Sequence, residues 1–175
     1  MKIALYGFMG AGKSTLGKAL AETLHYLFVD LDDEIEQFTR MSITEIFEKQ
    51  GEIAFRRLEH RVLKEIVKRD DDNIVLALGG GAVLSPQNRK LLEVKNFERL
   101  YLNVDIDQLL KRLQKEIHKR PLLKNIEKDA FEDFVKALFE SRRKQYEAYA
   151  DIDLEIGSED FEAVLNRLYL HFNMN

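Results

Sequence analysis

The chain contains no cysteine, which excludes disulfide bonds and thiolate zinc sites. Only two of its 175 residues are proline, and no low-complexity stretch marks a linker between separate domains. No apolar run approaches the ~18 residues that a membrane-spanning helix needs, and Met1 leads straight into an apolar segment with no room for a signal peptide. The four histidines lack the spacing of a metal site. These absences predict one domain, located in the cytoplasm, without a membrane partner.

Basic residues are in the minority, with 27 Lys and Arg against 31 Asp and Glu and a net charge of −4. No basic stripe dominates any segment, which argues against nucleic acid as a partner. Hydrophobic residues make up 45% of the chain and charged residues 33%, a composition typical of a globular protein with a real core.

Short apolar, β-prone runs recur along the chain, with helical patterns between them. The runs are Ile3–Tyr6, Tyr26–Val29, Asn73–Leu78, Arg99–Asn103 and Ile152–Ile156. Continuous apolar strands that alternate with helices predict a parallel sheet covered by helices on both faces.

Several short signals mark expected helix starts and insertions. The expected helix caps are the capping box Ser42-x-x-Glu45, Ser85 before Pro86, Asp105 and Ser158. The segment from about residue 32 to 59 has a helical pattern that is long for a single crossover between two strands, and we expect it to be an insertion. Residues of about 113–124 are rich in lysine, and we expect them to form a mobile lid.

The segment Gly7-Phe8-Met9-Gly10-Ala11-Gly12-Lys13-Ser14 fills the pattern G-x-x-x-x-G-K-[ST] between an apolar run and a helical pattern. In that context the pattern predicts a phosphate-binding loop, whose backbone N–H groups and helix N-terminus face phosphate oxygens. Lys13 is expected to reach the β- and γ-phosphates and Ser14 to bind Mg²⁺. Thr15 either contacts the α-phosphate or bonds locally in the first helical turn, and the two interpretations are equally good.

Two carboxylates, Asp30 and Asp32, follow the second apolar run. The carboxyl ends of parallel strands form the ligand crevice of an open sheet, and alternation along an extended chain puts both side chains on one side. One can approach Mg²⁺ and the other a substrate hydroxyl. An acidic cluster at a helix N-terminus, favoured by the helix dipole, explains the pair equally well.

Glycines and arginines complete the set of candidate residues. Gly79-Gly80-Gly81 follows the third run and can bring backbone N–H groups close to a ligand, although a flexible turn is the alternative. Arg56 lies three residues before Glu59 on a helix expected from about residue 52 to 69, so the pair can hold a guanidinium for a carboxylate ligand. Considered alone, Arg56 and Arg142 are explained more simply as parts of solvated charged faces.

Taken in order along nearly the whole chain, these motifs resemble the shikimate kinase family. The matching segments are the phosphate loop from Gly7 to Gly17, Phe28-x-Asp30-Leu31-Asp32-x-x-Ile35-Glu36, Gly51-Glu52-x-x-Phe55-Arg56-x-x-Glu59, Leu78-Gly79-Gly80-Gly81, Arg120-Pro121-Leu122-Leu123 and Arg142-x-x-x-Tyr146. The resemblance implies a monomeric α/β enzyme, a P-loop three-layer αβα sandwich with a five-stranded parallel sheet. It also implies a single kinase domain over residues 1–175, with the substrate-binding insertion at about 32–59 and the lid at about 113–124.

The implied reaction transfers the γ-phosphate of ATP to the 3-hydroxyl of shikimate. On the nucleotide side, the resemblance gives Lys13 the role of stabilising the transferred phosphate. Ser14 would bind Mg²⁺ directly, and Asp30 would hold it through water. Arg120, from the lid, would stabilise the phosphate charge, and Arg112 would lie on or near the adenine.

On the acceptor side, the resemblance makes Asp32 the ligand of the shikimate hydroxyls and the base. Arg56 and Arg142 would clamp the shikimate carboxylate. Gly79, Gly80 and Gly81 would line the site, with Gly80 in direct backbone contact.

The chain departs from the family pattern in two places. Leu31 stands where the family usually has serine or threonine, and the acidic turn Gly157-Ser158-Glu159-Asp160 replaces an arginine and a proline that often contact the adenine. A related small-molecule kinase, such as a gluconate-type enzyme, would lack the arginine pair with the triple glycine. A nucleotide-binding module without catalysis would not need Lys13, Asp30, Asp32 and Arg120 together.

Overall fold

The computed structural model describes residues 1–69, 71–117, 120–124, 126–157 and 159–173. In this part of the chain five parallel strands form one sheet, in the spatial order β2-β3-β1-β4-β5. The strands are β1 (Lys2–Tyr6), β2 (Leu27–Asp30), β3 (Ile74–Ala77), β4 (Phe97–Val104) and β5 (Ile152–Ile156). The predicted parallel sheet is confirmed, and the end of each predicted strand is shifted by at most two residues.

The central strands are apolar on both faces because helices cover both faces. In β1, Ile3, Ala4 and Leu5 have no exposed surface, and the strand pairs with β3 on one side and with β4 on the other. The sequence of a strand that is buried on both faces is a continuous apolar run, without alternation of apolar and polar residues. This is the pattern on which the sequence prediction depended.

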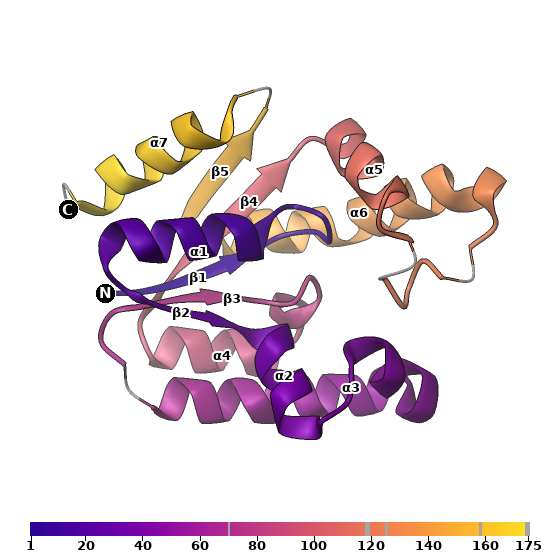
Figure 1. The fold of residues 1–175 in the computed structure, drawn as a ribbon, viewed down its shortest axis with the longest axis horizontal. Helices are drawn as coiled ribbons and strands as arrows, with labels where there is room; N and C mark the ends of the chain where they lie inside the picture. The colour runs from indigo at the N-terminus through magenta and orange to yellow at the C-terminus, as the bar shows by residue number, and fades with distance from the viewer. Residues whose placement is uncertain (70, 118–119, 125, 158, 174–175) are drawn as a thin grey trace.

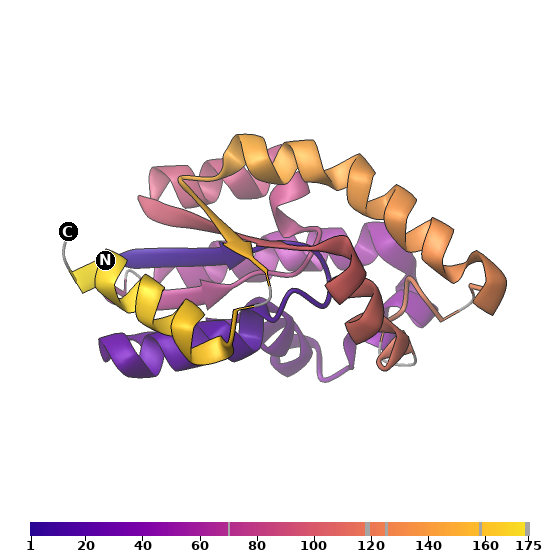
Figure 2. The same ribbon diagram turned by 90° about the horizontal axis from the view of Figure 1, so that it is seen from above.

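The helices form two layers around the sheet (Figures 1 and 2). They are α1 (Lys13–Leu24), α2 (Leu31–Thr39), α3 (Ile43–Lys68), α4 (Pro86–Val94), α5 (Ile106–Gln114), α6 (Phe131–Tyr149) and α7 (Phe161–Asn173), with short 3₁₀ turns η1 (Ala82–Leu84) and η3 (Lys128–Ala130). Figure 2 shows α1 and α7 below the sheet and α4 and α6 above it, which confirms the three-layer αβα arrangement. No helix in the described residues is both long and apolar enough to span a membrane.

Local capping explains where several helices begin. The Ser42 hydroxyl accepts from the Glu45 N–H, and the Glu45 carboxylate accepts from the Ser42 N–H, so the predicted capping box is formed. Ser85 caps α4 and Asp105 caps α5, as predicted. The predicted cap Ser158 lies outside the described residues.

Helix α3 is broken at Gly51, whose φ of 80° and ψ of 171° are not helical. The second segment matches the helix expected from about residue 52, while the first segment, together with α2, fills most of the predicted insertion. The break lets the two segments of α3 follow different directions, and the second segment carries Arg56 and Glu59.

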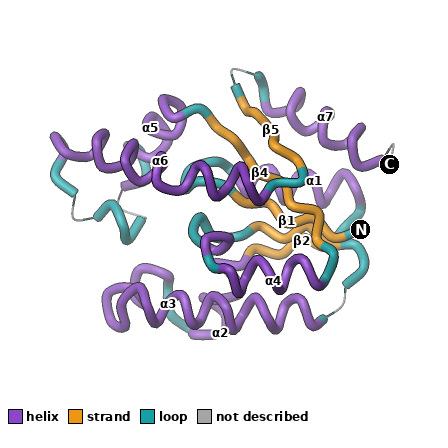
Figure 3. The backbone as a smooth tube through the Cα atoms, turned by 180° about the vertical axis from the view of Figure 1, so that it is seen from behind, coloured by secondary structure: helices purple, strands orange, loops and turns teal. Residues whose placement is uncertain are grey.

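The carboxyl ends of the three neighbouring strands β2, β3 and β1 meet at one edge of the sheet. The phosphate loop follows β1, Asp30 ends β2 and the glycine turn follows β3. Seen from behind (Figure 3), α2 and α3 lie on one side of these strand ends and α5 lies on the other. The fold therefore brings the candidate residues of the sequence analysis to a single place.

Candidate active site

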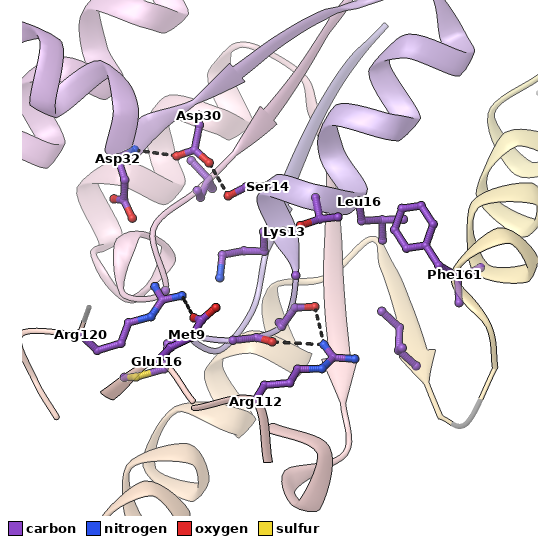
Figure 4. A pocket seen from close by; sticks show the side chains of 18 of the residues that line it. Met9, Lys13, Ser14, Leu16, Asp30, Asp32, Arg112, Glu116, Arg120 and Phe161 are labelled. Atoms are coloured by element: carbon purple, nitrogen blue, oxygen red, sulfur yellow. Dashed lines mark hydrogen bonds and ion pairs between the residues drawn. The ribbon is translucent and has the colours of Figure 1, made fainter. Parts of the chain in front are cut away.

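The phosphate loop borders a cavity of about 550 Å³ at the start of α1 (Figure 4). The predicted loop residues Gly10, Ala11, Gly12, Lys13, Ser14 and Thr15 all line it. The Lys13 ammonium donates to the carbonyls of Gly7 and Phe8, at 3.1 and 3.0 Å. Thr15 is exposed at the cavity rim. The loop is therefore folded around its own lysine, as a phosphate cradle requires.

Burial lowers the pKa of Lys13 to about 8, and the charge of Arg120 adds to this effect, while Asp32 opposes it. A lysine with a lowered pKa has lost hydration, and an anion that enters the cavity replaces the missing interactions. The electrostatics of the loop thus favour a negatively charged ligand next to Lys13.

Asp30 connects the loop to the second strand. The Ser14 hydroxyl donates to Asp30 Oδ2 at 2.5 Å, and Asp30 Oδ1 accepts from the Asp32 N–H at 2.9 Å, which caps α2. A hydroxyl and a carboxylate oxygen are the ligands that Mg²⁺ prefers. In the described residues, no group of three or more histidine or acidic side chains could by itself hold a metal ion.

Asp32 lies in the first turn of α2 and not on an extended strand. The expectation that strand alternation aligns Asp30 with Asp32 is therefore wrong, because the chain turns into a helix at Leu31. The alternative explanation, an acidic cluster at a helix N-terminus, is confirmed, and Asp30 and Asp32 both line the cavity. Figure 4 shows the Asp32 carboxylate, the Lys13 ammonium and the Arg120 guanidinium directed toward one common space.

The environment of Asp32 perturbs its acidity. Burial raises the pKa of this carboxyl to about 6, and the neighbouring charge of Asp30 adds to the rise. Its Oδ1 atom is buried without a hydrogen-bond partner. A buried acceptor atom of this kind fits a ligand that brings a hydroxyl donor.

A second cavity of about 90 Å³ lies beyond Asp32 and is small compared with the roughly 300–1,000 Å³ of common ligand pockets. Arg56, Arg142 and the glycine turn line it, together with apolar side chains of α3. Arg56 donates to Glu59 at 2.8 Å and to Glu52 at 3.3 Å. Glu59 has no exposed surface, and burial raises its pKa to about 7.

Burial of Arg142 and a buried partner of Arg56 explain why the two arginines do not lie on solvated faces. Arg142 is only 9% exposed although it carries a charge, and Arg56 is held by a carboxylate that is fully buried. Arg142 also lies over the ring of Phe8, with 6.0 Å from its Cζ to the ring centroid. Two guanidinium groups that border a small cavity, one buried and one partly buried, suit a carboxylate ligand, which a guanidinium binds with two N–H groups.

The glycine turn is close to both sets of side chains. A Cβ atom at Gly81 would overlap the Arg56 guanidinium, with 2.7 Å to its Cζ atom. A Cβ at Gly79 would lie 3.0 Å from Asp32 Oδ1 and 3.1 Å from Glu59 Oε1. Because the turn has no side chains, the charged groups of Arg56, Asp32 and Glu59 can lie directly against its backbone.

The two cavities share a wall made of Met9, Asp32, Gly80 and Arg120. Arg120 donates to Glu116 at 3.0 Å, so it already has an anionic partner four residues earlier. Lys124, in the same predicted lid, forms an ion pair with Glu48 of α3. The segment predicted to be a lid thus contacts α3 through Lys124 and borders both cavities through Arg120.

Arg112 lies at the other end of the larger cavity. Its guanidinium donates to the carbonyls of Gly10 and Ala11, at 3.2 and 3.4 Å. Glu159 of the acidic turn and Phe161, the first residue of α7, line the cavity as well. The place predicted for a nucleobase therefore holds a guanidinium on one side and residues of the last turn and helix on the other.

Sequence reasoning missed several residues of the site. Glu116, Phe161 and Met9 were not singled out, although a spacing of four, such as that between Glu116 and Arg120, is a detectable signal for an ion pair. No local pattern marks Phe161 as a cavity residue, because its place depends on the packing of α7 beside α1. Each predicted site residue borders one or both cavities.

Comparison with known proteins decides the family. A family model described as shikimate kinase matches residues 9–171. The chain belongs to the shikimate kinase family. A shikimate kinase of Synechococcus elongatus is 41% identical over 169 residues, which cover 96% of this chain and 84% of that protein. The members are kinases, and the protein is accordingly an ATP-dependent phosphotransferase.

Two further relatives show how far the likeness to shikimate kinases extends. The bifunctional shikimate kinase/3-dehydroquinate synthase of Thermotoga maritima is 40% identical over 153 residues, which are 87% of this chain but 29% of that protein. The structure of the shikimate kinase from Acinetobacter baumannii in complex with shikimate superimposes with a TM-score of 0.89, at 35% identity, covering 99% of this chain and 93% of that one. The likeness to a shikimate kinase structure thus extends over nearly the whole chain.

Proposed function

We propose that this enzyme transfers the terminal phosphate of ATP to the 3-hydroxyl of shikimate, giving shikimate 3-phosphate and ADP. The observation that carries the proposal is the wall that the two cavities share at Asp32, Gly80 and Arg120. Phosphoryl transfer requires the attacking hydroxyl and the transferred phosphate to meet in line, and adjoining cavities with charged groups at the junction provide that geometry. The related structure with bound shikimate supports the choice of acceptor.

In the acceptor cavity, Arg56 and Arg142 bind the shikimate carboxylate, and Asp32 accepts a hydrogen bond from the reacting hydroxyl. Ionised Asp32 is then within reach to take the proton as the new bond to phosphorus forms. Glu59 holds Arg56 in place, and the backbone of Gly79, Gly80 and Gly81 closes the far wall.

In the nucleotide cavity, Lys13 exchanges the carbonyls of Gly7 and Phe8 for phosphate oxygens when ATP binds. Its positive charge then stabilises the negative charge that spreads over the transferred group. Arg120 acts from the opposite side once phosphate has replaced Glu116 as its partner. Arg112 lies beside the nucleobase.

Mg²⁺ is the metal that these residues would accept. Ser14 would hold it directly and Asp30 through water, and both offer the hard oxygen atoms that it binds. When bound, the ion would neutralise part of the negative charge of the ATP phosphates. We further propose that residues 1–175 act as one monomeric kinase domain, with the acceptor insertion at about 32–59 and the lid at about 113–124.

The carboxylate clamp can be tested by substitution. Arg56→Ala and Arg142→Ala should each raise the KM for shikimate by about 10- to 100-fold, since each removes a hydrogen-bonded charge pair. The KM for ATP should change little, because neither side chain lines the nucleotide cavity. Initial-rate measurements with each substrate varied in turn check this. A loss of ATP binding alone would contradict the clamp.

The first experiment is a coupled assay of ADP release with ATP and Mg²⁺, with and without shikimate. Gluconate and AMP serve as alternative acceptors. Release that depends on shikimate alone supports the proposal. Release with gluconate instead supports a related small-molecule kinase, and nucleotide binding without any acceptor-dependent release supports a module without catalysis.

A further inference from the structure

One buried tyrosine hydroxyl touches two parts of the acceptor site. Tyr146, on α6, has no exposed surface, and its hydroxyl donates to the carbonyl of Gly80. The guanidinium of Arg142, one turn earlier on the same helix, lies next to this hydroxyl. Residues four apart on a helix share a face, so α6 presents the tyrosine and the arginine together.

The bond to Gly80 decides how the glycine turn is oriented. In a planar trans peptide, the C=O of one residue and the N–H of the next point in opposite directions. Because the Gly80 carbonyl is directed to Tyr146, the Gly81 N–H is directed away from it. Both glycines line the acceptor cavity, and no carbonyl of the described backbone accepts from either N–H. The tyrosine therefore fixes the peptide whose N–H, that of Gly81, is available at this wall.

The tyrosine itself is held from the opposite side. The Tyr6 hydroxyl donates to the Tyr146 carbonyl at 2.9 Å, and Tyr6 is the last residue of β1, directly before the phosphate loop. The rings of Tyr6, Tyr101 and Tyr146 pack together with centroids between 5.5 and 6.1 Å apart. Because the Tyr146 ring packs densely against these two tyrosines of the sheet, its hydroxyl is held in one position.

We propose that Tyr146 is a positioning residue, whose hydroxyl holds the Gly80 peptide and the Arg142 guanidinium in the orientation that receives the acceptor carboxylate. The proposal rests on the proposed function, since it takes that carboxylate as the ligand of the arginine pair. Tyr146 lines neither cavity and acts only through its two neighbours. Its loss should weaken acceptor binding and leave ATP binding and the phosphoryl transfer step unchanged.

The chain offers a matched control for Tyr146→Phe. Tyr149 is buried on the same helix, and its hydroxyl also donates to a backbone carbonyl, that of Arg89 at 3.0 Å, away from both cavities. We expect Tyr146→Phe to raise the KM for shikimate about five- to tenfold, as for one lost hydrogen bond, with kcat and the KM for ATP within about twofold of wild type. Tyr149→Phe should lose comparable stability in urea but keep all three kinetic parameters.

A second measurement tests whether the effect passes through the carboxylate. The methyl ester of shikimate lacks the charge, so the ratio of kcat/KM for shikimate to that for the ester reports carboxylate recognition. Tyr146→Phe should lower this ratio about fivefold or more, and Tyr149→Phe should not change it. A merely structural role would weaken both acceptors equally.

Two outcomes would overturn the role of Tyr146. One is that Tyr146→Phe changes neither the KM for shikimate nor the ratio of kcat/KM for shikimate to that for the ester. The other is that Tyr149→Phe changes these two quantities as much as Tyr146→Phe does. If Tyr146→Phe is too unstable for kinetics, the ratio is measured in Tyr6→Phe, which frees the Tyr146 carbonyl, and an unchanged ratio there contradicts the proposal. A wild-type enzyme that is inactive with shikimate refutes the proposed function itself, before any variant is compared.

Discussion

At the scale of single residues, Asp32 meets the two conditions that a base must satisfy near neutral pH. It borders both cavities, and one of its oxygen atoms is buried with no partner. Burial raises its pKa to about 6, so the group is ionised at neutral pH yet basic enough to take a proton. Lys13, across the same space, has its pKa lowered to about 8 and is still charged at neutral pH.

These two groups predict a bell-shaped pH profile of kcat/KM. The acidic limb should rise through about pH 6 as Asp32 loses its proton, and the alkaline limb should fall above about pH 8 as Lys13 loses its charge. Asp32→Asn should reduce turnover by about 10²- to 10⁴-fold and remove the acidic limb, while ATP still binds. Rates measured from pH 5 to 9 and a nucleotide titration check this. An active Asp32→Asn enzyme with an intact acidic limb would exclude Asp32 as the base.

Gly81 predicts a selective loss of acceptor affinity. Its missing side chain leaves room for the guanidinium of Arg56, which Glu59 and Glu52 hold against it. Gly81→Ala should push the guanidinium aside, because the end of a side chain yields more easily than the backbone. We expect the KM for shikimate to rise at least about tenfold and the KM for ATP to stay within about twofold. Equal changes in both constants would show that the turn as a whole had moved.

The nucleotide side of the site was easier to predict than the acceptor side, for a physical reason. Lys13 and Ser14 belong to one short loop, whose geometry follows from adjacent residues. The contact between Tyr146 and Gly80 joins positions 66 residues apart and depends on how α6 packs on the sheet. Nothing in the spacing of Arg142 and Tyr146 indicates that the hydroxyl reaches a carbonyl and not solvent.

At the scale of elements, the break in α3 separates two functions of one helix. The segment before Gly51 carries Glu48, which pairs with Lys124 of the lid segment, and the segment after it carries Arg56. A positive φ with ψ near 180° is a conformation that essentially only glycine adopts. A single residue of the sequence, Gly51, therefore determines where the helix is broken.

Gly51→Ala should reveal the conformational cost without a steric one. A Cβ at Gly51 would meet nothing within 4 Å, so the substitution strains only the backbone. We expect it to lower the free energy of unfolding by about 1–3 kcal/mol. Gly157→Ala is the control, because its Cβ also meets nothing and its φ is not positive, and it should change stability by less than about 0.5 kcal/mol. Urea unfolding of both variants decides, and equal stabilities would contradict a strained break.

The helix starts that are marked by nearby capping residues were predicted best from the sequence. The capping box at Ser42 and the caps at Ser85 and Asp105 involve residues within three positions of one another, and all three formed. The spatial order β2-β3-β1-β4-β5 was not predicted, because strand order depends on which crossover each helix makes. The turn of the chain into α2 at Leu31 was only one of two alternatives in the sequence, because the extended and helical continuations of β2 carry the same carboxylates.

At the scale of the whole molecule, buried ionisable groups make stability depend on pH. Burial raises the pKa of Glu59 to about 7, so the folded state binds its proton more tightly than the unfolded chain does. This stabilisation is complete below the pKa of the unfolded chain, near about 4.3, and is lost as pH rises through about 7. The ligand-free protein should therefore be more stable at pH 5.5 than at pH 7.5.

Glu59→Gln should flatten this dependence. The free energy of unfolding of the wild type should fall by about 1–3 kcal/mol between pH 5.5 and 7.5, and the variant should lose a large part of that slope. Glu52→Gln is the control, because Glu52 also pairs with Arg56 but is half exposed. Urea titrations at pH 5.5, 6.5 and 7.5 measure the slopes. A Glu59→Gln slope equal to that of Glu52→Gln would assign the effect to Arg56 and not to the buried carboxyl.

The shared wall between the two cavities has a consequence for how such an enzyme can change over evolution. Selection for better use of one substrate, acting on a residue of that wall, alters the fit of the other substrate at the same time. Residues that border only the acceptor cavity escape this conflict; they include Ile43, Phe47, Phe55 and Leu122. Three of them lie on α3, so a new acceptor is most readily acquired through that helix while the strand ends stay as they are.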